Sequence, residues 1–170
     1  FLSAHRCEDE GYTELRSLAV QQRKIEDFID LHRRQHDKQM PGSGRGLNGV
    51  YLEGPPGIGK SAMVQAMLKK NGYGIKDSEA RASRWFDKID AALSLEAQKK
   101  RIIEAFDAGQ AIVLDELNSC VHGGLERVLN SVLTGEHPDT GKAAQTPGFM
   151  AFFTGNSIAL SGREAISPAL

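Results

Sequence analysis

Apolar residues recur at every third or fourth position over residues 12–39, with charged residues between them, and this pattern predicts a long amphipathic helix. Further helices are predicted at 61–70, 94–107 and 124–134. Ser94 is placed to cap the start of its helix, and Gly109 is placed to end it. The helical pattern therefore accounts for a large part of the chain.

Short apolar runs with strand character separate these helices, at 49–53, 85–90, 111–114 and 149–153. Polar segments at 71–84 and 136–147 are predicted loops, the first with at most a short strand near Tyr73. Strands and helices alternate, and the connections are long enough for crossovers. We therefore predict a three-layer α/β domain around a central parallel sheet, with an N-terminal helix and linker at 1–46 and the core at 47–170.

A glycine-rich turn directly after the first predicted strand carries the most specific chemistry. Gly54-Pro-Pro-Gly-Ile-Gly-Lys-Ser61 matches G-x-x-x-x-G-K-[ST] at every fixed position. Glycines let backbone N–H groups wrap a phosphate, and the positive end of the following helix adds to anion binding. In this phosphate-binding loop (P-loop), Lys60 is expected to reach the β- and γ-phosphates and Ser61 to ligate Mg²⁺.

Acidic and amide side chains follow two of the later strands. The apolar run 111–114 ends in Asp115 and Glu116, and we expect the first to hold the Mg²⁺ shell and the second to activate water. The strand at 149–153 leads to Asn156, which is expected to sense the γ-phosphate from a strand lying between the other two. Either feature by itself also suits a plain strand end or turn.

Together these motifs resemble those of AAA+ ATPases. The P-loop looks like their Walker A motif, Leu114-Asp-Glu-Leu-Asn118 like the Walker B of the MoxR, dynein-related and midasin branch, and Thr154-Gly-Asn156 like sensor 1. Gly162-Arg163 and Ser167-Pro-Ala-Leu170 resemble a later stretch of midasin-like modules. The resemblance implies a P-loop NTPase fold, ATP and Mg²⁺ as cofactors, a six-membered ring that hydrolyses ATP at its subunit interfaces, and an unknown protein substrate that the ring remodels.

The resemblance also implies the residues of the site. Nucleotide contacts are expected from Gly54, Pro56, Gly57, Ile58, Gly59, Lys60, Ser61 and Ala62, metal contacts from Ser61 and Asp115, and catalytic roles for Lys60, Glu116 and Asn156. Leu18-Ala-Val20 either packs on the adenine or belongs to ordinary helix packing. Asp90 is a weak candidate for a contact with Glu116.

Three departures separate the chain from that branch. Ser157 stands where many relatives have proline, Ile166 stands where leucine is usual, and the chain stops at Leu170. We expect the arginine finger and the C-terminal helical lid to lie beyond this end. Arg163 is either an interface arginine or a surface residue.

Composition and charge narrow the class of protein. With 40% hydrophobic and 25% charged residues, the chain has the composition of a soluble globular domain. A net charge of -1 argues against a wholly basic nucleic-acid surface, although a local basic strip stays open. Cys7 and Cys120 favour a reduced intracellular compartment, the cytoplasm, and no apolar run suggests a membrane partner. His32 and His36 have helical spacing that a zinc site uses, but a solvated helix face is the favoured interpretation.

Two rival functions remain. A P-loop kinase shares the phosphate-binding loop, but Glu116 directly after Asp115 favours water as the nucleophile. An ATP-binding scaffold with little turnover needs only the binding residues, and a nucleic-acid motor is a variant within the ring-ATPase class.

Overall fold

The computed structural model describes residues 8–38, 48–53, 60–77, 83–90, 92–115 and 123–155. Their elements in chain order are α1 (Glu8–Lys38), β1 (Gly49–Glu53), α2 (Lys60–Lys70), β2 (Tyr73–Ile75), β3 (Arg84–Ile89), α3 (Leu95–Ala108), β4 (Ala111–Leu114), α5 (Gly123–Leu133) and β5 (Met150–Gly155). The predicted elements within these ranges are confirmed to within a few residues, including the short strand at Tyr73 in an otherwise irregular segment. No helix among the described residues is both long and apolar enough to cross a membrane.

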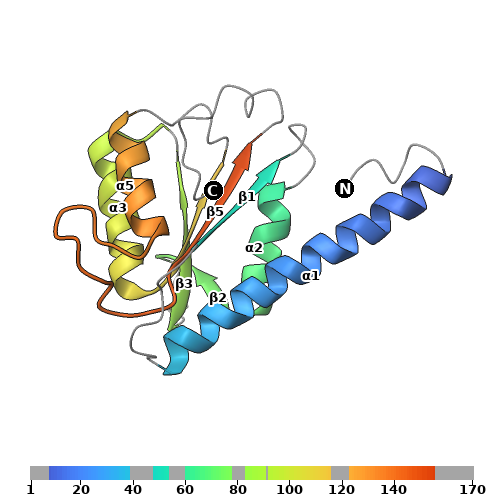
Figure 1. The fold of residues 1–170 in the computed structure, drawn as a ribbon, viewed down its shortest axis with the longest axis horizontal. Coiled ribbons are helices and arrows are strands. Elements are labelled where there is room, and N and C mark those ends of the chain that lie inside the picture. The colour runs from blue at the N-terminus through green and yellow to red at the C-terminus, as the bar shows by residue number, and fades with distance from the viewer. Residues whose placement is uncertain are drawn as a thin grey trace.

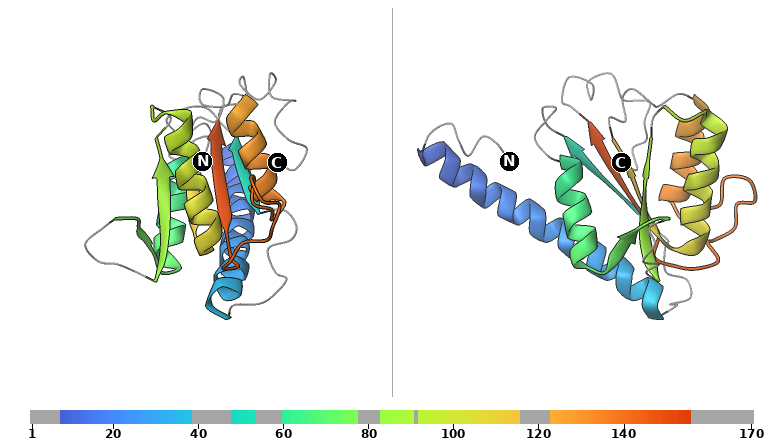
Figure 2. Two further views of the ribbon diagram at one scale, coloured as in Figure 1. Left: turned by 90° about the vertical axis from the view of Figure 1, so that its left-hand side faces the viewer. Right: turned by 180° about the vertical axis from the view of Figure 1, so that it is seen from behind.

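The five described strands form one parallel sheet in the order β1-β5-β4-β3-β2. Helices α1 and α2 cover one face, and α3 and α5 cover the other (Figures 1 and 2). The predicted three-layer α/β fold with a central parallel sheet is therefore confirmed, and it is the architecture of P-loop NTPases. Strand β5, the last in the chain among these five, lies between β1 and β4 as predicted.

The central strands are apolar on both sides because helices cover both faces of the sheet. All four residues of β4 and all six of β5 are buried. Successive side chains alternate between the two cores: Val113 and Phe152 face α1 and α2, whereas Leu114 and Phe153 face α3 and α5. This alternation decides which polar residues at the strand ends share a face.

The predicted boundaries of α3 are confirmed by its caps. The Ser94 hydroxyl accepts a hydrogen bond from the Ala97 N–H at 3.2 Å, which satisfies one unpaired donor of the first turn. Gly109 ends the helix in the left-handed conformation, with φ 66°. A side chain there would also meet the carbonyl oxygen of Pro147, 2.2 Å from an ideal Cβ position, so only glycine fits this turn.

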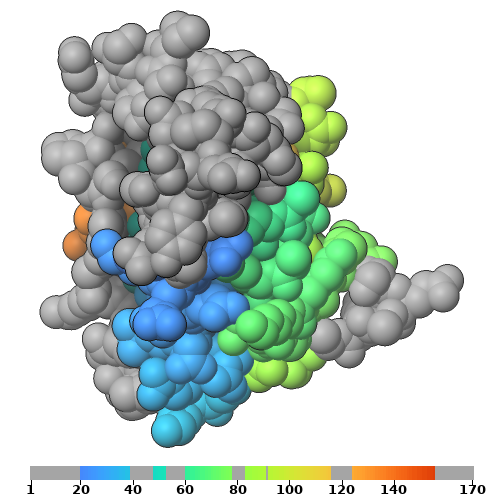
Figure 3. Space-filling model, turned by 90° about the vertical axis from the view of Figure 1, so that its right-hand side faces the viewer, coloured from blue at the N-terminus to red at the C-terminus, as the bar shows by residue number. Residues whose placement is uncertain are grey.

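The second half of α1 packs into the same core as the sheet. Ile25 and Ile29 are buried in the cluster that contains Val64 of α2, and Lys70 at the end of α2 donates to Glu26 at 3.0 Å. Figure 3 shows α1 and α2 side by side on this face. The predicted boundary between residues 46 and 47 separates α1 from the rest of the chain. Because α1 shares its apolar core with α2 and the sheet, this boundary stays a prediction.

The interpretation of His32 as part of a solvated helix face is wrong. His32 is 4% exposed; its Nδ1 lies 2.8 Å from the carbonyl oxygen of Phe28, and its Nε2 lies 3.4 Å from Oδ1 of Asn48. His36 is half-buried one turn later. Within the described part of the chain, no group of three or more histidine, cysteine or acidic residues could hold a metal ion, so nothing there supports a zinc site.

The burial of His32 predicts a pH dependence of stability. Burial lowers the pKa of His32 below its ordinary value of 6.5, because the charged imidazolium loses its hydration. The unfolded chain then binds the proton more readily than the folded one. This contribution to stability is therefore complete above the ordinary pKa and is lost as the pH falls from there towards the lowered pKa.

We expect urea unfolding to show a smaller free energy of unfolding at about pH 5.5 than at about pH 8. In His32→Gln, which cannot titrate at this position, the difference between the two conditions should shrink. An equal fall in both proteins would show that other groups cause it.

Candidate functional site

The carboxyl ends of the parallel strands β1, β4 and β5 meet at one edge of the sheet, and α2 begins beside them (Figure 1). Ligands of open α/β sheets bind at such an edge. Among the residues predicted to act on nucleotide, Lys60, Ser61 and Asp115 all lie here: the first two open α2, and the third directly follows β4.

Lys60 is held at this edge through its amine. Only 8% of the residue is exposed, and its Nζ donates a hydrogen bond to the carbonyl oxygen of Gly155 at 2.9 Å. The contact forms because α2 starts at the end of β1, and β5 is the strand that pairs with β1. A buried ammonium needs such a partner because burial removes its water.

Asp115 is held by β5 on one side and β3 on the other. The Thr154 hydroxyl donates to Oδ1 of Asp115 at 3.0 Å, and Nζ of Lys88 lies 3.2 Å from Oδ2. Thr154 and Gly155 are consecutive, so the end of β5 contacts both Asp115 and Lys60. The structure thereby brings together two residues that are 55 positions apart in the chain (115 − 60).

Two neighbouring charged residues of β3, Asp87 and Lys88, belong to different faces of the sheet. Asp87 faces α3 and is buried between Lys76 and Arg101, with Nζ of Lys76 at 3.6 Å and Nη1 of Arg101 at 3.1 Å from its carboxylate. Burial raises the pKa of Asp87 against the opposing effect of these two cations. Lys88, the next residue, faces the opposite side and joins the candidate site.

Ser61 lies in the first turn of α2, where its Oγ accepts a hydrogen bond from Nε2 of Gln65 at 2.9 Å. The hydroxyl keeps its own proton and a second lone pair for another partner. Ala62 is exposed on the same helix. Asp90 is exposed as well, and its carboxylate accepts from the N–H of Ala92 at 2.9 Å.

Several predicted residues lie outside the described part of the chain. They are Gly54, Pro56, Gly57, Ile58, Gly59, Glu116, Asn156 and Arg163. The described residues that flank them are Glu53, Lys60, Asp115 and Gly155, which lie at or directly after the end or start of an element at the same edge of the sheet. The roles assigned to these eight residues remain predictions.

Sequence reasoning gave Lys88 no role and named Thr154 only as part of the segment that resembles sensor 1, without its contact to Asp115. A signal for Thr154 was present, because two-residue alternation along 150–155 places it on the face of Phe152, which is also the face of Asp115. Lys88 carried no comparable signal, since the pairing of β3 with β4 is what brings it near Asp115.

The oxygen atoms that Asp115 and Ser61 offer at this edge are suitable donors for the kind of Mg²⁺ ion that P-loop proteins bind together with a nucleotide. Asp115 offers a carboxylate and Ser61 a hydroxyl, and both are hard oxygen donors. Mg²⁺ is commonly held by one or two carboxylates together with water and substrate phosphates, rather than by an all-protein cage.

No protein-family model matches this chain. Over 118 residues the chain is 28% identical to the Replication factor C large subunit of Pyrobaculum calidifontis, an AAA+ ATPase. The chain resembles an AAA+ ATPase. The similar region is 66% of this chain but 26% of that relative, so the chain spans about a quarter of the relative's length. With the fold, this distant similarity supports an AAA+ nucleotide-binding module.

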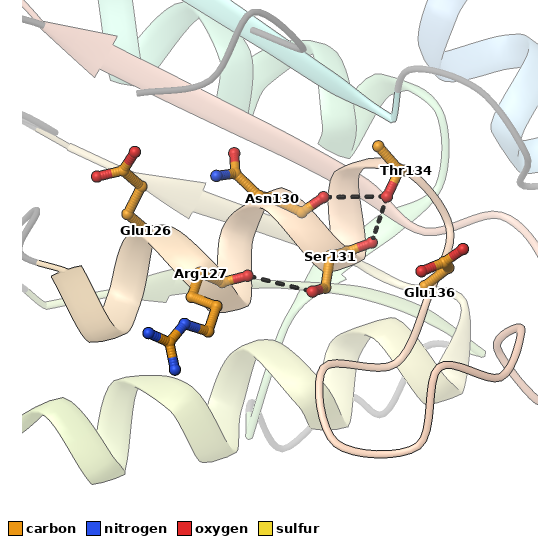
Figure 4. A pocket seen from close by; sticks show the side chains of 6 residues that line it. All are labelled: Glu126, Arg127, Asn130, Ser131, Thr134 and Glu136. Carbon is orange, nitrogen blue, oxygen red and sulfur yellow. Dashed lines mark hydrogen bonds between the residues drawn. The ribbon is translucent and has the colours of Figure 1, made fainter. Parts of the chain in front are cut away.

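A separate polar pocket lies on the outer side of α5 (Figure 4). It is lined by Glu126, Arg127, Asn130, Ser131, Thr134 and Glu136. The hydroxyls of Ser131 and Thr134 donate to carbonyl oxygens of their own helix, at 3.2 Å to Arg127 and 3.1 Å to Asn130. The end of α5, where Ser131, Thr134 and Glu136 line this pocket, contacts Asn48 just before the start of β1, at the opposite end of that strand from the edge that holds Lys60 and Asp115.

Proposed function

We propose that this chain is the Mg²⁺-dependent ATP-binding and ATP-hydrolysing core of an AAA+ ATPase. The observation that carries the proposal is the end of β5, which contacts the P-loop lysine through Gly155 and the metal-binding candidate Asp115 through Thr154. A lysine and a carboxylate on either side of one strand end are the pair that a triphosphate with its Mg²⁺ requires.

The proposed roles follow from the chemistry of each side chain. Residues 54–59 and the N–H groups at the start of α2 bind the phosphates, Lys60 neutralises their charge, and Ser61 with Asp115 holds Mg²⁺. Glu116 accepts a proton from the attacking water, and Asn156 orients that water or contacts the γ-phosphate. The metal supplies charge neutralisation between the β- and γ-phosphates when bound.

We further propose that the full protein assembles as a six-membered ring of the MoxR, dynein-related and midasin branch and remodels a protein partner. Leu114-Asp-Glu-Leu-Asn118 supports this branch. To test for the ring, ATP turnover per subunit is measured as a function of protein concentration. The protein used is a chain that extends through the lid. A steep rise with concentration indicates shared interface sites, because an arginine supplied in trans is worth about 10³-fold or more.

Tight ATP binding without turnover at any concentration would favour the alternative, an ATP-binding scaffold. Analysis of the products from labelled ATP separates the third candidate, since a P-loop kinase transfers the phosphoryl group to a second substrate and an ATPase releases phosphate.

The similarity to a protein named as a replication factor favours a variant that acts on nucleic acid. The net charge of -1 opposes that variant, and fluorescence anisotropy with labelled duplex DNA tests it.

The proposed metal site predicts that Thr154→Val weakens the response to Mg²⁺. Valine keeps the shape of threonine but cannot donate to Asp115, so the carboxylate loses the contact that orients it. Changes at residues that orient a metal ligand typically cost about 10–100-fold in metal affinity. We expect the Mg²⁺ concentration for half-maximal binding of a fluorescent ATP analogue to rise by about tenfold or more.

Thr134→Val provides the control, because the Thr134 hydroxyl is exposed and bonds only to carbonyl oxygens of α5 among the contacts described. It should leave the Mg²⁺ response unchanged. An unchanged response in Thr154→Val would remove Thr154 from the metal site.

A further inference from the structure

Both carboxylate oxygens of Asp115 are engaged by side chains of neighbouring strands. Oδ1 accepts from the Thr154 hydroxyl at 3.0 Å, and Oδ2 pairs with Nζ of Lys88 at 3.2 Å. The carboxylate is only partly accessible, with 28% of the Asp115 side chain exposed. A metal ion that approaches Asp115 therefore meets an oxygen that already has a partner.

The two partners differ in how easily they can leave. Thr154 is 4% exposed, and its strand is hydrogen-bonded on both sides, so its hydroxyl stays beside Asp115. Lys88 has a long side chain that is 53% exposed, so water can hydrate its ammonium group when that group moves away from Asp115. Lys88 is the partner that can be replaced.

Lys88 and Mg²⁺ are both cations, and both would use the negative charge of Asp115. With both at the carboxylate, two positive charges would lie within a few ångströms of each other and repel. The ion pair with Lys88 therefore stabilises the form without metal and opposes metal binding, in contrast to the Thr154 hydrogen bond, which carries no net charge.

Resting on the proposed function, we propose that Lys88 is a resident counter-ion of Asp115 that Mg²⁺ displaces, so that Lys88 sets the Mg²⁺ concentration at which the site binds nucleotide. Lys88 is a positioning residue in this role, acting on the metal through Asp115. Its removal should make Mg²⁺ binding easier, the opposite of the effect expected from Thr154→Val.

The experiment is a titration of free Mg²⁺ at a fixed concentration of fluorescent ATP analogue, with binding read as anisotropy. Lys88→Met keeps the aliphatic stem and removes the charge. Since exposed ion pairs are worth about 0.2–1 kcal/mol, we expect its half-saturating Mg²⁺ concentration to fall by about 1.4- to fivefold. Lys88→Arg should keep the wild-type requirement.

Lys99→Met is the matched control, because Lys99 lies on α3, on the other face of the sheet from Lys88, and pairs with Asp139 at 3.3 Å. It removes the same charge from the protein and should leave the titration unchanged. This control separates the local ion pair from a change in net charge.

A half-saturating concentration that is unchanged or higher in Lys88→Met overturns the inference. Weaker nucleotide binding by this variant in EDTA, without a shift of the Mg²⁺ midpoint, would overturn it in favour of a direct phosphate contact. Failure of the wild-type protein to bind nucleotide at any Mg²⁺ concentration would instead contradict the proposed function. The two failures are therefore distinguishable.

Discussion

Lys60→Ala is expected to weaken ATP binding by at least about thirtyfold, because losing one partner of a buried, hydrogen-bonded charge pair costs about 2–5 kcal/mol. The Lys60 amine is buried at the carboxyl edge of the sheet, beside the strand end that also contacts Asp115. Phosphate oxygens would meet this cation in surroundings with little water, where charge interactions are strong. Equilibrium binding of a fluorescent ATP analogue measures the effect.

Two further variants test whether the loss of ATP binding is specific to the amine of Lys60. Lys60→Met keeps the aliphatic stem and removes the amine, so it should lose binding while preserving the packing at the start of α2. Lys70→Ala removes an exposed lysine from the last turn of the same helix and should bind normally. If thermal unfolding shows that Lys60→Ala is folded, and its affinity is unchanged, the phosphate assignment is wrong.

Glu116→Gln is expected to bind ATP and to hydrolyse it about 10²–10⁴-fold more slowly, the range typical of a lost general base. Glutamine keeps the size of glutamate but cannot accept the proton of the attacking water. The expectation rests on the position of Glu116 directly after Asp115, the residue that follows the buried strand β4 at the site. Phosphate release by the full-length protein measures turnover, and filter binding with labelled ATP measures retention.

Glu104→Gln serves as the control, since Glu104 is an exposed residue of α3 that pairs with Lys76 at 2.9 Å. It should hydrolyse ATP at the normal rate. Normal turnover in Glu116→Gln would exclude the proposed role and direct attention to other acidic residues at this edge.

The elements of the fold could be predicted from local pattern because each helix or strand buries a continuous apolar run or stripe of its own residues. The run 111–114 and the caps at Ser94 and Gly109 show this most clearly. Lys60 and Asp115 could also be singled out from the sequence, because each belongs to a motif whose residues are consecutive in the chain. Their nearness followed from one rule, that parallel strands end at a shared edge.

The environment of His32 could not be predicted in the same way. Its spacing from His36 is compatible with an exposed helix face or a buried one. The choice depends on how α1 rotates against the sheet, and Ile25 and Ile29 on the same side draw His32 into the core beside Asn48. Packing of the whole helix outweighs the preference of a single polar residue for water.

Local sequence was sufficient for the helices, the strands and the α/β class, since these depend on neighbouring residues and on the period of apolar positions, whereas the P-loop stays a prediction. The sequence also placed the last strand between the strands at 49–53 and 111–114, but the tertiary structure alone decided that Thr154 and Gly155 contact Asp115 and Lys60. It also decided that Lys88 pairs with Asp115. These contacts depend on strand order and register, which arise from burying two faces of one sheet at once, and no short segment of sequence carries that information.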